Sequence, residues 1–252
     1  MRKIAIYGKG GIGKSTTTAH LSAALALKGH KVMQIGCDPK SDSTKNLMGG
    51  KRIPTVLDQL KEKGDDLQLE DIVFEGFAGV LCVEAGGPTP GVGCAGRGII
   101  SAFEKLAELE AFENYKPDVV IYDVLGDVVC GGFAMPIRGG YAKEVFVVSS
   151  GEMMALYAAN NIAQAIKNFG RRGYAKMTGI ILNARNVENE QELVAKAAEE
   201  IGTKVVHYIP RSGDIQEAEH AGGTVFEFCQ NSPMVNVYSS LADKVLEMSQ
   251  DV

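Results

Sequence analysis

One short segment near the start constrains the fold more than any other feature of this sequence. The segment GKGGIGKS fits G-x-x-x-x-G-K-[ST] directly after a β-branched run and directly before a helical pattern. In that setting backbone amides surround phosphates, Lys14 reaches the β- and γ-phosphate oxygens, and the Ser15 hydroxyl binds Mg²⁺. The sequence therefore predicts a site for Mg-ATP. Its predicted residues are Gly8, Lys9, Gly10, Gly11, Ile12, Gly13, Lys14, Ser15 and Thr16.

Short apolar runs alternate with longer helical patterns along the chain. The predicted strands span residues 3–8, 31–36, 79–84, 118–124, 144–150, 178–184 and 204–210, and the predicted helices span 15–29, 98–112, 153–170, 188–202 and 232–252. Near-continuous apolar strands are typical of parallel sheets that are covered on both faces. We therefore expect an α/β fold with a doubly wound, mostly parallel sheet, of the P-loop NTPase class. A chain of 252 residues fits a single domain over residues 1–252.

The composition argues against several classes of partner. The chain has 26 basic and 31 acidic side chains and a net charge of −5, so binding to nucleic acid or to a membrane surface is not expected. No apolar run reaches the roughly 18 residues of a membrane span, and the first residues form a strand pattern rather than a signal peptide. We expect a cytoplasmic protein. Its odd number of cysteines, five, favours thiolate or metal chemistry over disulfides.

Lys9 is a second lysine within the glycine loop. Loops of the form GKGG-x-GK[ST] resemble those of the deviant Walker A ATPases, in which this lysine crosses a dimer interface. The resemblance implies that Lys9 reaches a phosphate, in its own site or in that of a facing subunit. The alternative is a solvated lysine.

Two further segments are predicted to lie near the phosphates, because ligands of such folds bind beyond the carboxyl ends of the strands. Asp38, Lys40 and Asp42 follow the second predicted strand. Asp38 would orient the attacking water and Asp42 would help to hold Mg²⁺, although Asp and Ser also form ordinary Asx-turns. Asp123 lies at the end of the apolar run DVVIYD and suits the outer shell of the metal, and Gly126 can donate its N–H to the γ-phosphate.

Two cysteines lie in glycine-rich segments that favour a thiolate. Cys94 lies in GGPTPGVGCAGRG and Cys130 in VVCGGF, each just before small residues where a helix can begin. A thiolate there meets free backbone donors and the positive end of a helix dipole, which suits an anionic iron–sulfur cluster. A [4Fe–4S] cluster usually takes four thiolates, so a symmetric dimer would supply two from each chain. On spacing alone, the alternative is two buried small hydrophobic side chains.

The other candidates are assigned to packing. No C-x-x-C and no Cys/His zinc pattern occurs, and the four histidines form no cluster. Apolar surroundings make packing the simpler interpretation for Cys37, Cys82, Cys229, Tyr7, Met153 and Met154.

Over nearly its whole length the sequence resembles the nitrogenase iron protein (dinitrogenase reductase) family. The resemblance rests on GKGGIGKSTTT, GCDPKSDST, GGPTPGVGCAGRG, YDVLGDVVCGGFAMPIR and SGEMMALYAANNI. It implies an ATP-hydrolysing oxidoreductase, the reductase component of a larger complex. In this reading a homodimer couples Mg-ATP binding and hydrolysis to one-electron transfer from a single bridging [4Fe–4S] cluster to a two-subunit catalytic component. Ferredoxin or flavodoxin would supply the electrons.

The resemblance also implies roles for single residues. Cys94 and Cys130 of each protomer would bind the shared cluster. Residues 38–43 would form a first switch, and residues 123–126 a second switch that leads to Cys130.

Further matches concern docking and the nucleotide base. Arg97 matches an arginine on the partner-docking face, which some members have ADP-ribosylated. Asn183 matches an adenine-reading asparagine, and Pro210 and Arg211 lie in the loop that closes over the base.

Several departures from the family pattern bear on the catalytic partner. After Pro210-Arg211, nitrogen-fixing members usually carry an acidic residue, whereas this chain has Ser212 and Gly213, with Asp214 two places later. The segment AEHAGGTVFEF lacks the basic pair that nitrogen-fixing members often have there. The sequence ends at Val252, before the C-terminal extension typical of those members. The segment NLMGGKRIPTVLDQLKEKG, after the first switch, resembles nitrogenase-like reductases more. We therefore lean to a tetrapyrrole or carbon–sulfur reductase as partner. The alternative is a nitrogen-fixing dinitrogenase reductase proper.

Two other classes of P-loop ATPase fit the sequence less well. A positioning ATPase would need a basic tail or patch, but the last predicted helix carries Asp243, Glu247 and Asp251 against Lys244 alone. An iron–sulfur scaffold or carrier ATPase would present a C-x-x-C, which is absent.

Overall fold

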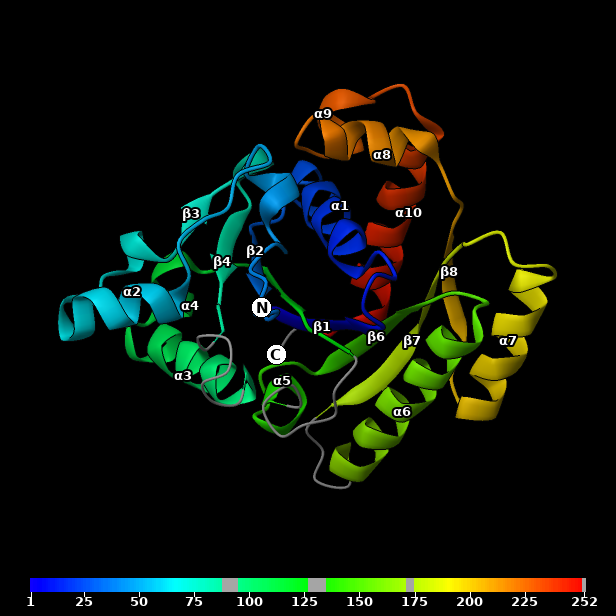
Figure 1. Ribbon diagram of the computed structural model, residues 1–252, viewed down its shortest axis with the longest axis horizontal. Coiled ribbons are helices and arrows are strands. Elements are labelled where there is room, and N and C mark those ends of the chain that lie inside the picture. Colours follow the sequence, from blue (N-terminus) through cyan, green and yellow to red (C-terminus); the bar gives the residue numbers. More distant parts are fainter. Residues whose placement is uncertain (88–94, 127–134, 171–174, 251–252) are drawn as a thin grey trace.

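The computed structural model describes residues 1–87, 95–126, 135–170 and 175–250 (Figure 1). Its strands are β1 (Arg2–Gly8), β2 (Val32–Gly36), β3 (Phe74–Glu75), β4 (Leu81–Glu84), β5 (Val119–Asp123), β6 (Glu144–Ser149), β7 (Lys176–Asn183) and β8 (Val205–Ile209). Its helices are α1 (Lys14–Leu27), α2 (Val56–Lys63), α3 (Ala95–Glu108), α4 (Ala111–Tyr115), α5 (Met135–Arg138), α6 (Met153–Gly170), α7 (Glu190–Ile201), α8 (Gly213–His220), α9 (Val225–Phe228) and α10 (Pro233–Met248).

The strands form one eight-stranded sheet in the order β3-β4-β2-β5-β1-β6-β7-β8. All neighbours pair in parallel except β3, which runs antiparallel to β4. The expected doubly wound, mostly parallel sheet is therefore confirmed. Antiparallel β3 closes one margin of the sheet.

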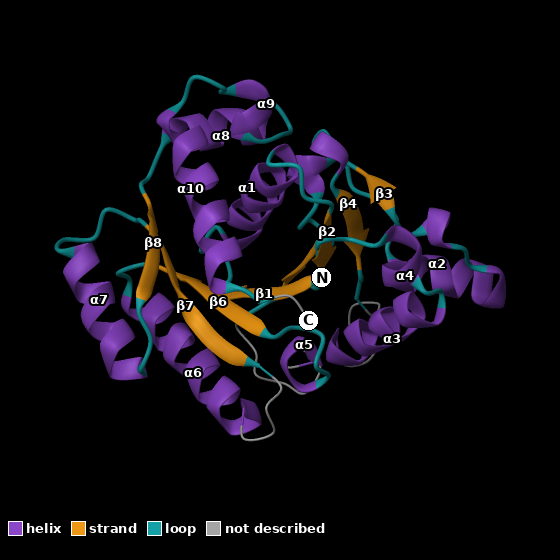
Figure 2. Ribbon diagram, turned by 180° about the vertical axis from the view of Figure 1, so that it is seen from behind, coloured by secondary structure: helices purple, strands orange, loops and turns teal. Residues whose placement is uncertain are grey.

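Helices cover both faces of the sheet (Figures 1 and 2). Because side chains alternate along a strand, Ala5 and Tyr7 of β1 pack on one face, in the core formed with α2, α3, α6 and α7. Ile4 and Ile6 point the other way, into the core formed with α1, α8, α9 and α10. This double burial explains why the central strands are continuous apolar runs.

All seven predicted strands are present, and β3 is an additional one. The predicted helix at 98–112 is interrupted, since Glu110 takes a left-handed conformation (φ 54°) between α3 and α4. The closing helix is confirmed as α10, which begins where Ser232 accepts a hydrogen bond from the N–H of Met234. Helices α2, α5, α8 and α9 were not predicted. Within the described part of the chain, no helix is both long and apolar enough to cross a membrane.

The strand order places three predicted segments side by side. β5 lies between β1 and β2, and Asp123 at its end is in register with Ile6 of β1 and with Gly36 of β2. Three segments therefore begin side by side at the carboxyl edge of the sheet: the glycine loop after β1, the first switch after β2 and the second switch after β5. Gly126 lies so close to Gly8 that an added Cβ would be 2.4 Å from the Gly8 carbonyl oxygen.

Candidate functional site

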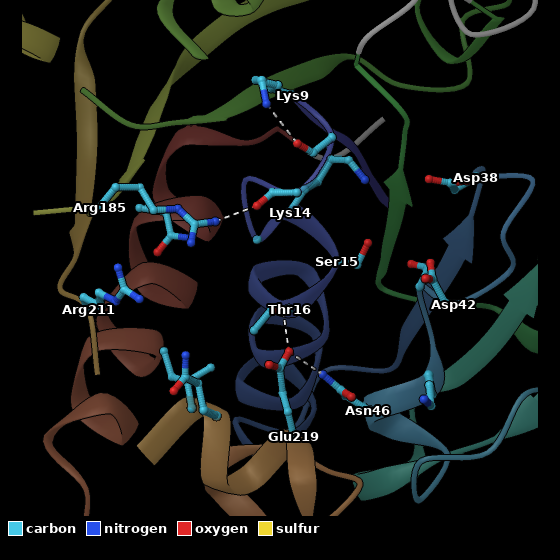
Figure 3. A pocket seen from close by; sticks show the side chains of 18 of the residues that line it. Lys9, Lys14, Ser15, Thr16, Asp38, Asp42, Asn46, Arg185, Arg211 and Glu219 are labelled. Carbon is cyan, nitrogen blue, oxygen red and sulfur yellow. Dashed lines mark hydrogen bonds between the residues drawn. The ribbon is translucent and has the colours of Figure 1, made fainter. Parts of the chain in front are cut away.

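The glycine loop opens into a cavity of about 570 Å³ at the carboxyl edge of the sheet (Figure 3). The cavity walls contain most of the predicted nucleotide residues, namely Lys9, Gly10, Gly11, Gly13, Lys14, Ser15, Thr16, Asp38, Lys40, Asp42, Asn183, Pro210 and Arg211. Gly8 and Ile12 lie behind the wall, and Ile12 packs in the core.

The loop turns directly into α1. Gly13 has a φ of 89°, a left-handed conformation that disfavours other residues. No side chain caps α1, so its first backbone N–H groups remain available to an anion in the cavity. This geometry fits the phosphates of a nucleotide, because free amides and the positive end of the helix dipole face one space.

Asp123 joins the glycine loop to the first switch. Its Oδ1 accepts from Lys14 Nζ at 2.8 Å, and its Oδ2 accepts from Ser43 Oγ at 2.6 Å. Lys14 is 6% exposed, Ser43 2% and Asp123 0%. Burial lowers the pKa of Lys14, but the adjacent Asp123 carboxylate outweighs burial, and the net pKa is raised. Lys14 is therefore a cation held in a buried pair at the bottom of the cavity.

The first switch contributes both predicted aspartates to the cavity wall. Asp38 Oδ1 accepts from the N–H of Lys40 at 2.9 Å, so Asp38 forms the Asx-turn that was the ordinary alternative. The Lys40 side chain is 67% exposed and its Nζ lies 4.0 Å from Asp38 Oδ2. Figure 3 shows Asp38 and Asp42 on the side of the cavity that Ser15 faces, which suits Mg²⁺ with oxygen ligands.

The far wall carries the predicted base-binding residues. Asn183 Nδ2 donates to the Ile12 carbonyl at 2.7 Å, which places this side chain against the glycine loop. Arg185, which was not predicted, donates from Nη2 to the Gly11 carbonyl at 2.6 Å. Its only sequence signal was its position two residues after Asn183.

The loop after Pro210 and Arg211 is built differently from the resembled pattern. Ser212 Oγ accepts from the N–H of Asp214 and caps α8. The Asp214 carboxylate accepts from the Ser232 hydroxyl and is absent from the described wall of the cavity. Asp214 thus links α8 to the residue that caps α10.

Glu219 is a second residue that the sequence did not single out. Its Oε1 accepts from Thr16 Oγ1 at 2.5 Å and from Asn46 Nδ2 at 3.2 Å (Figure 3). Glu219 therefore ties α8 to the start of α1 and to the short turn after the first switch. Contacts of this kind join residues 203 and 173 positions apart, so no local pattern reports them.

Lys9 bends back toward its own loop, with Nζ 3.4 Å from the Gly10 carbonyl oxygen. Arg97 lies in the first turn of α3 and is exposed. Its exposure is compatible with the docking role that the resemblance implies. That role, like a contact of Lys9 with a second protomer, stays a prediction.

Both predicted cluster ligands, Cys94 and Cys130, lie outside the described residues. The thiols of Cys37 and Cys82 are fully buried in the two cores, and burial raises the pKa of each. Such thiols are poor metal ligands, because the thiolate is disfavoured. The assignment of these two cysteines to packing is confirmed. The described residues contain no group of three His, Cys, Asp or Glu side chains suited to a metal ion.

The assignment of Met153 and Met154 to core packing is wrong. Their residues are 79% and 60% exposed at the start of α6, and Tyr157 on the next turn is 60% exposed. Tyr7, by contrast, is buried as expected. Three side chains at the start of α6 therefore form an exposed apolar surface, which we call the α6 face (Met153, Met154 and Tyr157). It adjoins the carboxyl end of β6, on the edge that carries the cavity.

Comparison with known proteins decides the family. Residues 2–252 match the family described as 4Fe-4S iron sulfur cluster binding proteins, NifH/frxC family. The chain belongs to this family. NifH/frxC proteins bind a [4Fe–4S] cluster, so the resemblance and the cluster cofactor deduced from the sequence are confirmed. A nitrogenase iron protein from Methanospirillum hungatei JF-1 is 57% identical over 249 residues, covering 98% of this chain and 88% of the relative.

Solved structures that are similar overall support the fold alone. The cell division ATPase MinD of Pyrococcus furiosus superposes with a TM-score of 0.74 at 21% identity, covering 98% of this chain and 99% of MinD. MinD of Pyrococcus horikoshii OT3, solved with Mg-ADP, has a TM-score of 0.73 at 24% identity, covering 97% and 96%. These ATPases confirm the P-loop architecture of this NifH/frxC member.

Proposed function

We propose that this protein is the ATP-dependent, electron-donating reductase component of a nitrogenase or nitrogenase-like complex. It acts as a homodimer in which Cys94 and Cys130 of each protomer hold one [4Fe–4S] cluster. The bound cluster supplies one-electron chemistry. Family membership supports the cluster. Control of the cluster by nucleotide is supported by a single observation, that Asp123 accepts hydrogen bonds from both Lys14 and Ser43.

Lys14 has two competing partners in this proposal. Its ammonium pairs with Asp123 at 2.8 Å. The β- and γ-phosphate oxygens of ATP offer Lys14 a more highly charged partner, and Ser15 and Asp42 lie where Mg²⁺ would accompany them. Transfer of Lys14 to the phosphates frees Oδ1 of Asp123. Asp38 orients the attacking water, and the Gly126 N–H donates to the γ-phosphate.

The change at Asp123 then reaches the cysteines through the chain itself. Asp123 ends a rigid, fully buried strand, and Gly126 is packed on Gly8, so this stretch moves with the glycine loop. Cys130 follows Asp123 by only seven residues. Nucleotide-dependent contacts at the second switch would therefore alter the surroundings of the thiolate of Cys130. Switch segments of other P-loop proteins respond to nucleotide in the same way.

The homodimer is supported by the α6 face. Exposed Met and Tyr side chains beside a nucleotide cavity are costly in water, and a second copy would remove them from it. Lys9 lies on the same edge and would reach the facing site. The surface around Arg97 would contact the two-subunit catalytic component, with ferredoxin or flavodoxin as electron source.

For the catalytic partner we propose a nitrogenase-like component, a tetrapyrrole or carbon–sulfur reductase. The Ser212-Gly213 step, which is used to cap α8, supports this proposal. The alternative is a nitrogen-fixing partner, and the 57% identical relative, a nitrogenase iron protein, favours it. Reconstitution with the two-subunit candidates encoded beside the gene separates the two, because only the true partner accepts electrons in the presence of Mg-ATP.

Anaerobic purification with iron and sulfide analysis tests the core of the proposal. We expect about four irons per dimer, as one [4Fe–4S] cluster requires. Cys94→Ser and Cys130→Ser should each abolish the cluster, whereas Cys82→Ser should retain it. A complete cluster in a monomer, or iron retained in both ligand variants, would contradict the proposal.

A further inference from the structure

A second buried carboxylate lies under the first switch, on the opposite side from Asp123. Glu84 is the last residue of β4 and is fully buried. Its Oε1 accepts from the N–H of Thr44 at 2.7 Å and from Thr44 Oγ1 at 2.8 Å. Thr44 directly follows the first switch and is 1% exposed. A single carboxylate oxygen therefore fixes both the backbone and the side chain at the end of the switch.

The two carboxylates flank the same residue of β2. Gly36 pairs with Glu84 on one side and with Asp123 on the other. A Cβ on Gly36 would lie 2.0 Å from Glu84 Oε2 and 2.7 Å from the Cβ of Ser43, so this position must be glycine to admit both side chains. Asp123 holds Ser43, and Glu84 holds the next residue, Thr44. Hydrogen bonds to β5 and to β4 therefore hold the end of the first switch from both sides.

The chain that leaves β4 also contacts the beginning of the first switch. A Cβ on Gly87 would lie 2.5 Å from the Cβ of Pro39, which stands between Asp38 and Lys40. Gly87 therefore lies against the switch at Pro39, while Glu84 holds it at Thr44. In sequence this stretch runs directly into the glycine-rich segment that carries Cys94.

We propose that Glu84 is a positioning residue that couples the first switch to the chain between β4 and Cys94. Nucleotide would thus act on this protein by two routes, through Asp123 toward Cys130 and through Thr44 and Glu84 toward Cys94. The inference rests on the proposed function only in that nucleotide displaces the first switch. It does not require a cluster to be bound.

We expect the substitution of Glu84 to change the hydrogen-exchange response to nucleotide in one segment of the chain and not in another. Hydrogen exchange of the dimeric protein is measured by mass spectrometry with and without Mg-ATP, in peptides covering residues 85–96 and residues 119–134. In the wild type, nucleotide changes exchange in both peptides. In Glu84→Ala the change at 85–96 falls by about fivefold or more, because loss of either of the two hydrogen bonds from Thr44 alone corresponds to about fivefold, while the change at 119–134 persists. Glu84→Gln keeps an acceptor toward Thr44 and restores the response.

Glu144 offers a matched control. It is also a buried strand carboxylate, 2% exposed, and its Oε2 accepts from Thr178 Oγ1 at 2.7 Å. It begins β6 and so lies at the opposite edge of the sheet from the cavity. Glu144→Ala should leave both nucleotide responses intact, although it removes a hydrogen bond of the same length and an ion pair with Lys176 at 3.3 Å.

Two variants keep the inference testable if Glu84→Ala does not fold. Thr44→Val removes the hydroxyl donor, and Gly87→Ala forces Pro39 away, and each leaves Glu84 in place. Each should also reduce the response at 85–96 selectively. The inference is overturned if nucleotide leaves 85–96 unchanged in the wild type, if Glu84→Ala affects both peptides alike, or if Glu144→Ala has the same effect. A protein without iron that still shows the selective pattern would refute the proposed function and support the coupling.

Discussion

Oδ1 of Asp123 lies 2.8 Å from Nζ of Lys14, and neither side chain is more than 6% exposed. The loop lysine is therefore paired with a carboxylate of the second switch. In the proposed function, a nucleotide exchanges this buried charge pair for one between Lys14 and its phosphates, so we expect its binding to change the contacts of Asp123. The buried ion pair itself adds little net stability, because the cost of desolvating both charges offsets their attraction.

The first prediction concerns that pair. Asp123→Asn should lower the free energy of unfolding by about 3–5 kcal/mol, because it leaves the Lys14 ammonium buried without a carboxylate. Adding Lys14→Met should recover most of this loss, and both variants should lose Mg-ATP affinity. Urea denaturation in a double-mutant cycle measures the coupling. The exposed pair Lys61–Asp58 is the control, with a coupling of about 0–1 kcal/mol. A similarly small coupling at Lys14–Asp123 would argue against the buried pair.

Gly126→Ala tests the contact between the second switch and the glycine loop. The new Cβ would lie 2.4 Å from the Gly8 carbonyl oxygen, so backbone must move. We expect a loss of about 1–3 kcal/mol in stability, as for other overpacking substitutions, with a clear fall in nucleotide affinity measured by calorimetry. Gly213→Ala is the control, since nothing lies within 4 Å of its added Cβ. Equal affinities in the two variants would show that the contact is not needed for binding.

The sequence was sufficient for the sheet and for the phosphate-binding loop. Apolar runs such as residues 118–124 identify buried strands because both of their faces are covered, and the glycine loop has its own spacing. Helices α2 and α8 escaped prediction because each has only eight residues and few buried side chains. Caps at Thr55 and Ser212 define them instead.

Local patterns could not reveal the polar contacts beneath the switches. Ser43 meets Asp123 across 80 residues, and Thr44 meets Glu84 across 40, so only the strand order brings them together. Met153 and Met154 were misassigned for a related reason. Apolar character alone does not distinguish a core from a surface that a partner covers.

His20 gives a prediction on pH. It is fully buried, its Nε2 accepts from the N–H of Val225 at 3.1 Å, and its Nδ1 therefore carries the hydrogen that faces the Thr16 carbonyl at 2.8 Å. Burial lowers the pKa of His20 to about 4. Because the folded state binds this proton less readily than the unfolded state, stability that is full above pH of about 6.5 is lost as the pH falls toward 4.

Replacement of His20 by Gln should remove that part of the pH dependence, since an amide donates and accepts without titrating. The expected contribution is about 3 kcal/mol between pH 6.5 and 4, because the pKa of His20 falls from 6.5 to about 4 on folding. Urea denaturation at several pH values measures it. His30→Gln is the control, at a position outside the helix. An unchanged slope in His20→Gln would assign the acid sensitivity to other groups.

Met153→Lys tests the α6 face. The side chain is 79% exposed, so the folded protomer should keep its stability to within about 0.5 kcal/mol. A charge there opposes burial against a second copy, and we expect dimer affinity to fall by about tenfold or more. Sedimentation velocity with and without Mg-ATP measures the change. Leu193→Lys, at a 41% exposed position on α7, should leave the dimer intact. Dimerisation unaffected by Met153→Lys would place the subunit contact elsewhere.

Asn183→Ala addresses the choice of base. The side chain lies in the cavity wall and donates to Ile12, which leaves its Oδ1 as an acceptor for the amino group of adenine. We expect the preference for ATP over GTP to fall by about fivefold, the effect of roughly one hydrogen bond. Competition binding with both nucleotides measures the ratio. Asn114→Ala, on α4, is the control and should not change it. If Asn183→Ala weakened both nucleotides equally, the residue would support the loop without reading the base.

The margin of the sheet next to β4 has a consequence for solubility. β3 is only two residues long and runs against its neighbour. A long, open parallel strand at that margin would invite strand addition between molecules and the growth of aggregates. A truncated, reversed strand offers almost no such template. At this margin, strand addition between molecules at high concentration is therefore disfavoured, which leaves less competition there for a specific, closed association of two copies.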